Sequence, residues 1–384
     1  MTEMSHHSIY KPHKSIRLVT LAVWIFISFF VQPSQVLAAS GMPDSTEFGY
    51  GARLDLWGQE IDLSINAAAA IGLDWIGIEF DWARHWPDPQ SSADLEILDG
   101  VMVKVKHHQI NVLLSISNPP AWATTPVGPD VQRTIDLITL LVDRYPDDLL
   151  TIELFPAANT FKGWGAPPDP ISYSVLLNAA QIALKSSHSS AIIIAAGLTP
   201  LSPGHSPVDM DDIVYLSALY EAGAAAFMPI VSVRLNELDG DTMTPPDGND
   251  PRVLRHYETV RQVMLKYNHT NGLIWITDFT WPSSKVETSE QTRWLIQAFP
   301  IMKSQLYLGV AFFDRLNPPD KPISMASHSL IQKYDLNTHL HPAMGTLGQI
   351  ITVGRTGQAT SLSMYLYKKM VAGPNKSYLK TNLQ

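Results

Sequence analysis

Acidic, amide and indole side chains recur directly after short apolar stretches of this chain. Glu79, Asn118, Asp278 and Asp314 each stand at or just past the end of such a stretch, and a tryptophan follows closely after the first three. Carboxylates and amides form directed hydrogen bonds with hydroxyl groups, and indole rings stack on the C–H faces of sugars. These residue types therefore favour contact with a polyhydroxylated ligand, and with a suitable pair of carboxylates they would also favour its hydrolysis.

The candidates for ligand contact combine four tryptophans with five polar residues. For any single tryptophan, the alternative is that its ring packs a loop onto the rest of the fold. The acidic candidates have the alternative of pairing with a nearby arginine, for which Arg84 and Arg315 are available, and Glu153 is expected to be a buried, hydrogen-bonded carboxylate. The full set of candidates is Glu79, Trp82, Asn118, Trp122, Asn159, Trp164, Arg234, Trp281 and Asp314.

The elements that must position these residues alternate between β-like and helix-like stretches, which is the pattern of an α/β fold. Eight β-like stretches, each followed by a helix-like one, favour a closed (β/α)₈ barrel over a doubly wound sheet. In such a barrel the functional residues gather at the carboxyl ends of the strands. The predicted strands are 48–51, 75–80, 110–117, 150–155, 191–196, 230–234, 273–279 and 307–313.

Helix start signals support this alternation. Asp169-Pro170 precedes a predicted helix over 171–185, Asp209 precedes another that runs to Ala222, and the capping box 284–287 precedes a third over 288–299. No G-x-G-x-x-G motif follows the first strand, so a dinucleotide cofactor is not expected. The pairs His107-His108 and His339/His341 lack a spaced carboxylate partner, so no metal is expected either.

Composition and the first residues indicate an exported protein. The chain has 384 residues, a net charge of −9 and no cysteine, so nucleic acid is not expected as a partner and disulfides are excluded. Basic residues, an apolar run over 18–31 and small residues near Ala39 predict a signal peptide over 1–39; an uncleaved membrane anchor is the alternative. The barrel is expected over 40–353 and a short tail or appendage over 354–384.

Three segments together resemble a known group of enzymes. Residues 75–82 (WIGIEFDW), 113–122 (LLSISNPPAW) and 274–282 (IWITDFTWP) are similar to segments of the clan A retaining glycoside hydrolases, especially the cellulase-like and family-39-like bacterial barrels. The similarity extends from about Tyr50 to Phe313, and several segments match in order. The resemblance implies a (β/α)₈ barrel descended from enzymes that hydrolyse glycosidic bonds.

The resemblance also implies where the catalytic residues would stand. Those enzymes use two glutamates about 5 Å apart, an acid/base in an Asn-Glu-Pro motif after strand 4 and a nucleophile after strand 7. Here the motif falls on 156–158 (Pro-Ala-Ala), so Ala157 stands at the acid/base position, and the nucleophile position holds Asp278, which is one methylene shorter. An arginine of strand 2 and a histidine of strand 6 are replaced by Gly77 and Arg234.

These replacements lead to three hypotheses. The first is an exported barrel that no longer cleaves by the two-glutamate route and binds carbohydrate or another component of the cell envelope. The second is an active glycosidase that uses Asp278 together with a relocated acid, for which Glu79 and Asp314 are the candidates. The third is a scaffold without a sugar ligand.

Overall fold

The structure is a computed structural model that describes residues 48–149, 151–187, 189–201, 206–235, 246, 254–281, 287–318, 331–334, 337–340 and 342–356. All of them lie within one compact unit, Pro43–Gln384. The signal peptide or anchor predicted over 1–39, and residues 357–384 of the predicted tail, lie outside the described residues. Within the described ranges, no helix combines the length and the apolar character needed to cross a membrane.

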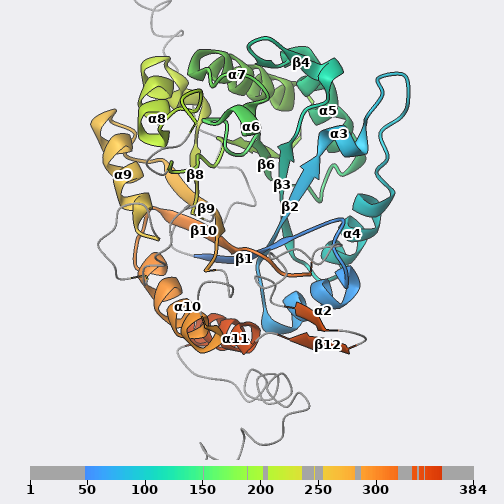
Figure 1. Ribbon diagram of the computed structural model, residues 1–384, viewed down its shortest axis with the longest axis vertical. Helices are drawn as coiled ribbons and strands as arrows, with labels where there is room; N and C mark the ends of the chain where they lie inside the picture. Colours follow the sequence, from blue (N-terminus) through green and yellow to red (C-terminus); the bar gives the residue numbers. More distant parts are fainter. Residues whose placement is uncertain are drawn as a thin grey trace, which may run out of the picture. The chain divides into compact units, whose positions relative to one another are not determined.

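Eight parallel strands form one sheet that curls into a nearly closed barrel with helices around its outside (Figure 1). Their order in the sheet is β7-β6-β3-β2-β1-β10-β9-β8, which is the cyclic order of a (β/α)₈ barrel. The predicted strands are therefore confirmed to within a few residues at their ends. The bounds are β1 Gly49–Leu54, β2 Trp75–Asp81, β3 Asn111–Ser117, β6 Thr151–Leu154, β7 Ile192–Ile194, β8 Ile230–Arg234, β9 Leu273–Phe279 and β10 Leu308–Phe313.

The ring of strands closes between β7 and β8 with less pairing than elsewhere. In the described part of the chain, this junction consists of one isolated bridge, Leu198 to Val233, and two backbone hydrogen bonds. The Ala195 amide donates to the Ile230 carbonyl and the Arg234 amide to the Leu198 carbonyl, each over 3.2 Å. Each of the other adjacent strand pairs forms a ladder of at least three residue pairs, so this junction is the thinly bonded seam of the barrel.

Helices follow the strands and cover the outside of the barrel. Three short elements lie between a strand and the helix that follows it: the 3₁₀-helix η1 Ala121–Ala123 and two hairpins, β4 Thr124–Thr125 with β5 Gly128–Pro129 and β11 Ile331–Tyr334 with β12 Asn337–Leu340. A second 3₁₀-helix, η2 Ala224–Phe227, lies between α8 and β8. The expected boundary after residue 353 falls inside the last helix. The helices are α2 Ile61–Ile71, α3 Trp82–His85, α4 Glu96–His107, α5 Val131–Arg144, α6 Phe161–Trp164, α7 Pro170–Ser186, α8 Asp212–Glu221, α9 His256–Lys266, α10 Thr288–Lys303 and α11 Pro342–Thr356.

The helix starts agree with the sequence in one case and differ in another. Asp169 caps α7 by accepting from the amides of Ile171 and Ser172, as predicted. The cap of α8 is Asp211 rather than Asp209, whose carboxylate instead accepts from the Phe161 amide at 2.7 Å. Two aspartates close together both suit a cap, so spacing alone did not separate them. The first residues of the predicted capping box, 284–286, lie outside the described residues.

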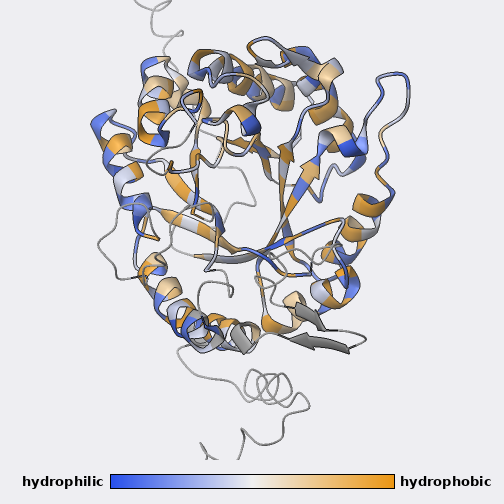
Figure 2. Cartoon of the chain, viewed as in Figure 1, coloured by the Kyte–Doolittle hydropathy of each residue, from blue (hydrophilic) through white to orange (hydrophobic). Residues whose placement is uncertain are grey.

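The main hydrophobic core lies between the strands and the surrounding helices. Figure 2 shows that the strands are largely apolar and that the helices carry apolar and polar faces. Outward-facing strand residues such as Ile76, Val112, Ile152 and Ile274 pack there against helix residues. The core residues of neighbouring helices recur at helical spacing, as the amphipathic pattern requires.

A separate aromatic cluster fills the inside of the barrel near the amino ends of the strands. The rings of Trp75 and Trp275 have centroids 4.9 Å apart, and Phe312 lies 6.3–6.4 Å from both. Glycines make room for these rings: a Cβ on Gly51 would lie 2.5 Å from Phe312, and one on Gly309 would lie 2.6 Å from Trp275. The interior is thus solid at this level, and the polar residues lie above it, towards the carboxyl ends.

Candidate functional site

The predicted site residues follow the carboxyl ends of several strands, which lie at one end of a parallel barrel; we call this end the mouth. Two of them, Glu79 of β2 and Asn118 after β3, are exposed there. Ser117 donates to Glu79 Oε1 at 2.8 Å, and the Asn118 side chain donates to Asp81 Oδ1 at 2.7 Å. Asp81 also caps α3 by accepting from the Arg84 amide. Neighbouring side chains thus hold both exposed groups in place.

Glu79 carries its charge in the folded protein. Desolvation by the surrounding protein raises the pKa of its carboxyl, but Arg53, Arg234, the hydrogen bond from Ser117 and Arg315 lower it, and the net effect places the pKa below its ordinary value. An ionised carboxylate only accepts hydrogen bonds. At neutral pH, Glu79 is therefore suited to binding hydroxyl or ammonium groups and not to donating a proton.

Asp278, at the nucleophile position of the resemblance, lies at the end of β9 and is only 2% exposed. Its Oδ2 forms an ion pair with Arg234 Nη2 at 3.0 Å, and the Arg234 side chain is itself largely buried. The two residues are neighbours in the β8–β9 pairing, beside a register shift at Val233. A carboxylate engaged this way is a weaker nucleophile than an unpaired one, because the neighbouring guanidinium stabilises its negative charge.

The loop after β6 places a methyl group at the acid/base position of the resemblance. Phe155 and Ala157 both have left-handed backbones, with φ of 52° and 60°. The Ala157 amide donates to the Gly197 carbonyl at 2.8 Å, and its carbonyl accepts from the amide and hydroxyl of Thr160. The backbone is therefore fixed on both sides of Ala157, while its side chain can neither hold nor pass a proton.

Beneath the mouth, a hydrogen-bonded network links several strands across the barrel. Glu153 of β6 is fully buried and accepts from Ser115 Oγ at 2.5 Å, the Gly197 amide at 2.8 Å and Thr277 Oγ1 at 3.1 Å. The prediction of a buried, hydrogen-bonded carboxylate is confirmed. Arg53 of β1 joins the network by donating to Ser115 Oγ and to the Thr277 carbonyl.

The four predicted tryptophans occupy different environments. Trp82 and Trp164 are completely enclosed, and Trp281 is buried with its ring 5.6 Å from that of Trp294 on α10. Trp122 is half-buried, and its indole donates to the Trp86 carbonyl. Of the four rings, Trp122 therefore offers the most surface to a ligand.

Asn159 and Asp314 are also enclosed. Both hydrogens of the Asn159 amide are used, on the Thr199 and Met210 carbonyls at 2.9 Å each, and its oxygen accepts from the Thr199 amide. Asn159 thus fastens one loop to another. Asp314 is 8% exposed, and its carboxylate lies 3.8 Å from Arg315.

Two tryptophans and an aspartate at the mouth were not singled out by the sequence. Trp57 and Trp86 are half-buried and follow β1 and β2, as Trp122 follows β3. The Arg84 guanidinium stacks 3.6 Å above the Trp57 ring, and Arg315 pairs with Asp55 at 2.8 Å. An indole soon after each of three consecutive strands was the signal that could have identified this aromatic rim.

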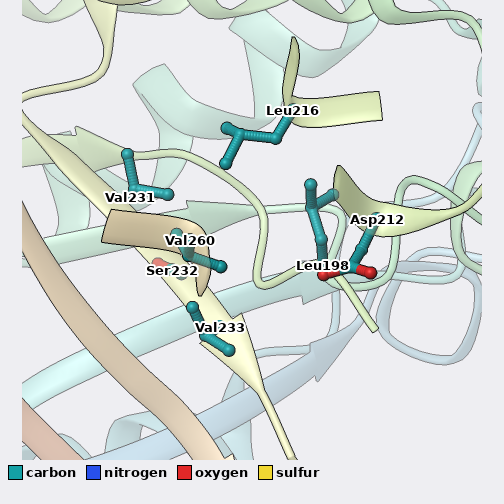
Figure 3. A pocket seen from close by; sticks show the side chains of 7 residues that line it. All are labelled: Leu198, Asp212, Leu216, Val231, Ser232, Val233 and Val260. Carbon is teal, nitrogen blue, oxygen red and sulfur yellow. The ribbon is translucent and has the colours of Figure 1, made fainter. Parts of the chain in front are cut away.

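Outside the mouth, residues of β8 and of the helices α8 and α9 line a small cavity of about 10 Å³. Figure 3 shows the side chains around it. This is room for about one water molecule. Asp212, which borders it, forms a 2.6 Å pair with the buried His256. The cavity is too small for a sugar. Its lining residues are Leu198, Asp212, Leu216, Val231, Ser232, Val233 and Val260.

The histidine pairs do not assemble into a metal centre in the described part of the chain. His108 bonds to the Asn66 side chain at 3.0 Å, and its ring contacts that of His107. The side chain of His339 and all of His341 lie outside what the structure describes. Among the described residues, no group of three or more potential ligands is arranged to hold a metal ion.

The fold is a (β/α)₈ barrel similar to the cellulase-like barrels of clan A glycoside hydrolases of known structure. It is similar to a family 39 glycoside hydrolase from Bacteroides cellulosilyticus WH2, with a TM-score of 0.60 and 13% identity over 82% of this chain and 66% of that one. The chain thus spans just under two thirds of that enzyme.

Two further structures show the same likeness. For GH5_18 from Streptomyces cattleya, in complex with GlcNAc, the TM-score is 0.64 with 12% identity over 81% of each chain. For the family 1 β-glucosidase from Thermotoga maritima it is 0.57, with 11% identity over 81% of this chain and 98% of that one. No protein-family model and no curated protein sequence matches the chain. At these identities the likeness concerns the fold.

Proposed function

We propose that this protein is an exported, glycoside-hydrolase-like barrel that binds carbohydrate at its mouth without cleaving it by the two-carboxylate route. The observation that carries the proposal is the pair of replacements at the catalytic positions. Ala157 has no proton to give, and the Asp278 carboxylate is buried against Arg234. General acid catalysis alone is worth roughly 10²–10⁴-fold, so its loss disables the retaining mechanism.

Carbohydrate binding is supported by the groups that remain at the mouth. Glu79 offers an ionised acceptor, Asn118 offers an exposed amide, and Trp122 offers a half-buried indole. Together they provide directed hydrogen bonds and a stacking surface, the combination that suits a sugar. A cell-envelope glycan is the partner that fits an exported protein of this kind.

The glycosidase with a relocated acid is the less favoured alternative. Glu79 would have to hold a proton at working pH, whereas its arginine neighbours lower its pKa. Asp314 is enclosed and lies beside Arg315. The lowered pKa of Glu79 is the opposite of what a general acid needs near neutral pH, and Asp314 is buried beside a guanidinium.

A glycan array probed with the mature chain tests the proposal. We expect binding to at least one envelope or plant-wall glycan, lost in Glu79→Gln and in Trp122→Ala. The matched controls are Glu96→Gln, an exposed carboxylate on α4, and Leu306→Ala, the side chain of which is 78% exposed away from the mouth. No binding to any glycan would favour a scaffold, and aryl-glycoside turnover abolished by Asp278→Asn would establish the enzyme instead.

A further inference from the structure

The side chain of Arg53, on β1, occupies space that a glycine on the neighbouring strand β2 leaves free. In the β1–β2 pairing, Arg53 lies opposite Gly77. A Cβ on Gly77 would lie 3.4 Å from Arg53 Cγ, 3.5 Å from its Nη1 and 3.1 Å from the Phe312 ring. The Arg53 side chain therefore crosses the inner face of β2 in the space that a side chain at position 77 would take.

The Arg53 guanidinium reaches the level of Glu79. Its Nη1 lies 3.4 Å from Ser115 Oγ, and Ser115 is the register partner of Glu79 on one side and of Glu153 on the other. The same nitrogen donates to the Thr277 carbonyl at 3.1 Å. Glu79, Ser115 and Glu153 thus form one layer inside the barrel, with Arg53 directed at it from β1.

Arg53 is a buried charge without a direct ion pair among the described residues. The residue is 6% exposed, and its Nη2 has no hydrogen-bond partner in that part of the chain. A buried guanidinium is costly unless negative charge compensates it. The two carboxylates of the layer are placed to do so. Glu153 is linked to Arg53 through the Ser115 hydroxyl, and Glu79 is the register partner of Ser115 on β2 and feels the charge of Arg53.

We propose that Arg53 is a positioning residue, which crosses from β1 over Gly77 to hold the Glu79 carboxylate ionised and oriented at the mouth. Glu153 holds the Ser115 hydroxyl that receives the guanidinium, and so fixes Arg53 in turn. The inference goes beyond sugar binding, because it concerns the charge state of Glu79 in the free protein. Without Arg53, Glu79 would become a more easily protonated group and a poorer acceptor for ligand hydroxyls.

Other charged groups also face Glu79 and must be separated from Arg53. Arg234 comes from β8, where it is paired with Asp278, and Arg315 follows β10, where it is paired with Asp55. Asp81 lies two residues after Glu79 on β2, and its charge is opposite to that of the arginines. Both paired arginines have a carboxylate of their own nearby, so their influence on Glu79 is smaller than that of Arg53.

The test is a carboxyl titration of the full chain without ligand, followed by NMR on ¹³C-labelled glutamate and assigned by comparison with Glu79→Gln. We expect the pKa of Glu79 to rise in Arg53→Gln, to rise less in Arg315→Gln, and to stay unchanged in Arg144→Gln, which removes an exposed charge at the end of α5. An unchanged Glu79 pKa in folded Arg53→Gln, or an equal rise in Arg315→Gln, would overturn the proposal.

Moving the arginine from β1 to β2 provides a rescue experiment. Adding Gly77→Arg to Arg53→Ala returns the arginine from the neighbouring strand, and we expect it to lower the Glu79 pKa again relative to Arg53→Ala alone. If Arg53→Gln fails to fold, Arg53→Lys is measured instead. This variant keeps the positive charge, so we expect the pKa of Glu79 to stay below its ordinary value. A normal or raised pKa of Glu79 in Arg53→Lys would refute the role of Arg53. Because no ligand is used, failure here is distinguishable from failure of the glycan array.

Discussion

Ala157 has a left-handed backbone although it carries a Cβ, with φ of 60°. Such a conformation costs a non-glycine residue about 1–2 kcal/mol, because the Cβ approaches the following carbonyl oxygen. We therefore expect Ala157→Gly to leave the free energy of unfolding unchanged or to raise it by up to about 1 kcal/mol, once the greater chain entropy of glycine is included.

The control for this prediction is the next residue. Ala158 is fully buried and is not among the residues of positive φ, so Ala158→Gly is expected to destabilise the protein. Urea unfolding of both variants measures the difference. Equal destabilisation by the two substitutions would mean that the strain at Ala157 is relieved by its surroundings.

The lowered pKa of the Glu79 carboxyl leads us to expect that the stability of the protein depends on pH. The folded pKa of Glu79 is lowered, by Arg53 first among the charges that act on it, so its contribution is complete above the unfolded pKa of about 4.5 and is lost as the pH falls through the folded pKa. We expect the stability difference between the native protein and Glu79→Gln to shrink between neutral pH and acid. Denaturant unfolding at several pH values measures it, and a difference that is constant with pH would contradict the lowered pKa.

The sequence located part of the candidate site and could not locate the rest. Glu79 and Asn118 were predicted because a polar residue near or just after the carboxyl end of a parallel strand has few places to point other than the mouth. Residue type does not say whether an indole after a strand faces ligand or core, so Trp82 and Trp122 looked alike. Arg53 was missed because β1 continues three residues beyond its predicted end, and because the burial of Arg53 depends on the space that Gly77 leaves on the next strand.

At the scale of elements, the strand β1 depends on its glycines. A Cβ on Gly51 would lie 2.5 Å from the Phe312 ring, which is fixed between Trp75 and Trp275. We expect Gly51→Ala to lower the free energy of unfolding by about 1–3 kcal/mol, the usual range for overpacking. Gly100→Ala on α4, where a Cβ would meet nothing within 4 Å, is the matched control and is expected to be neutral or stabilising.

Most elements were predictable because their periodicity is strong. Strands β8 and β9 match their predicted ranges, since continuous apolar runs with β-branched residues suit strands buried on both faces. Helix α10 was expected to end at Phe299 but continues through Pro300 to Lys303. Phe299 and Met302 are fully buried there, and their packing outweighs the backbone hydrogen bond that the proline cannot donate.

At the scale of the whole molecule, the replacements at the mouth act together. A new glutamate at position 278 would still face the Arg234 guanidinium, which is now paired with Asp278 at 3.0 Å. We expect Ala157→Glu with Asp278→Glu to leave aryl-glycoside hydrolysis at background, and the further change Arg234→His to raise it. Release of nitrophenol from a panel of aryl glycosides measures both variants, and substantial turnover with Arg234 in place would show that the pair does not restrain the nucleophile.

The thinly bonded seam between β7 and β8 has a consequence for how the barrel loosens. Two amide hydrogen bonds and one bridge join these strands in the described part of the chain, and the water-sized cavity lies directly behind them. Local opening that breaks few bonds needs the least free energy. Deuterium from the solvent should therefore replace the amide hydrogens of Ala195 and Arg234 well before those of β2 and β3. The first local opening of the barrel would then separate β7 from β8, next to the arginine that pairs with Asp278.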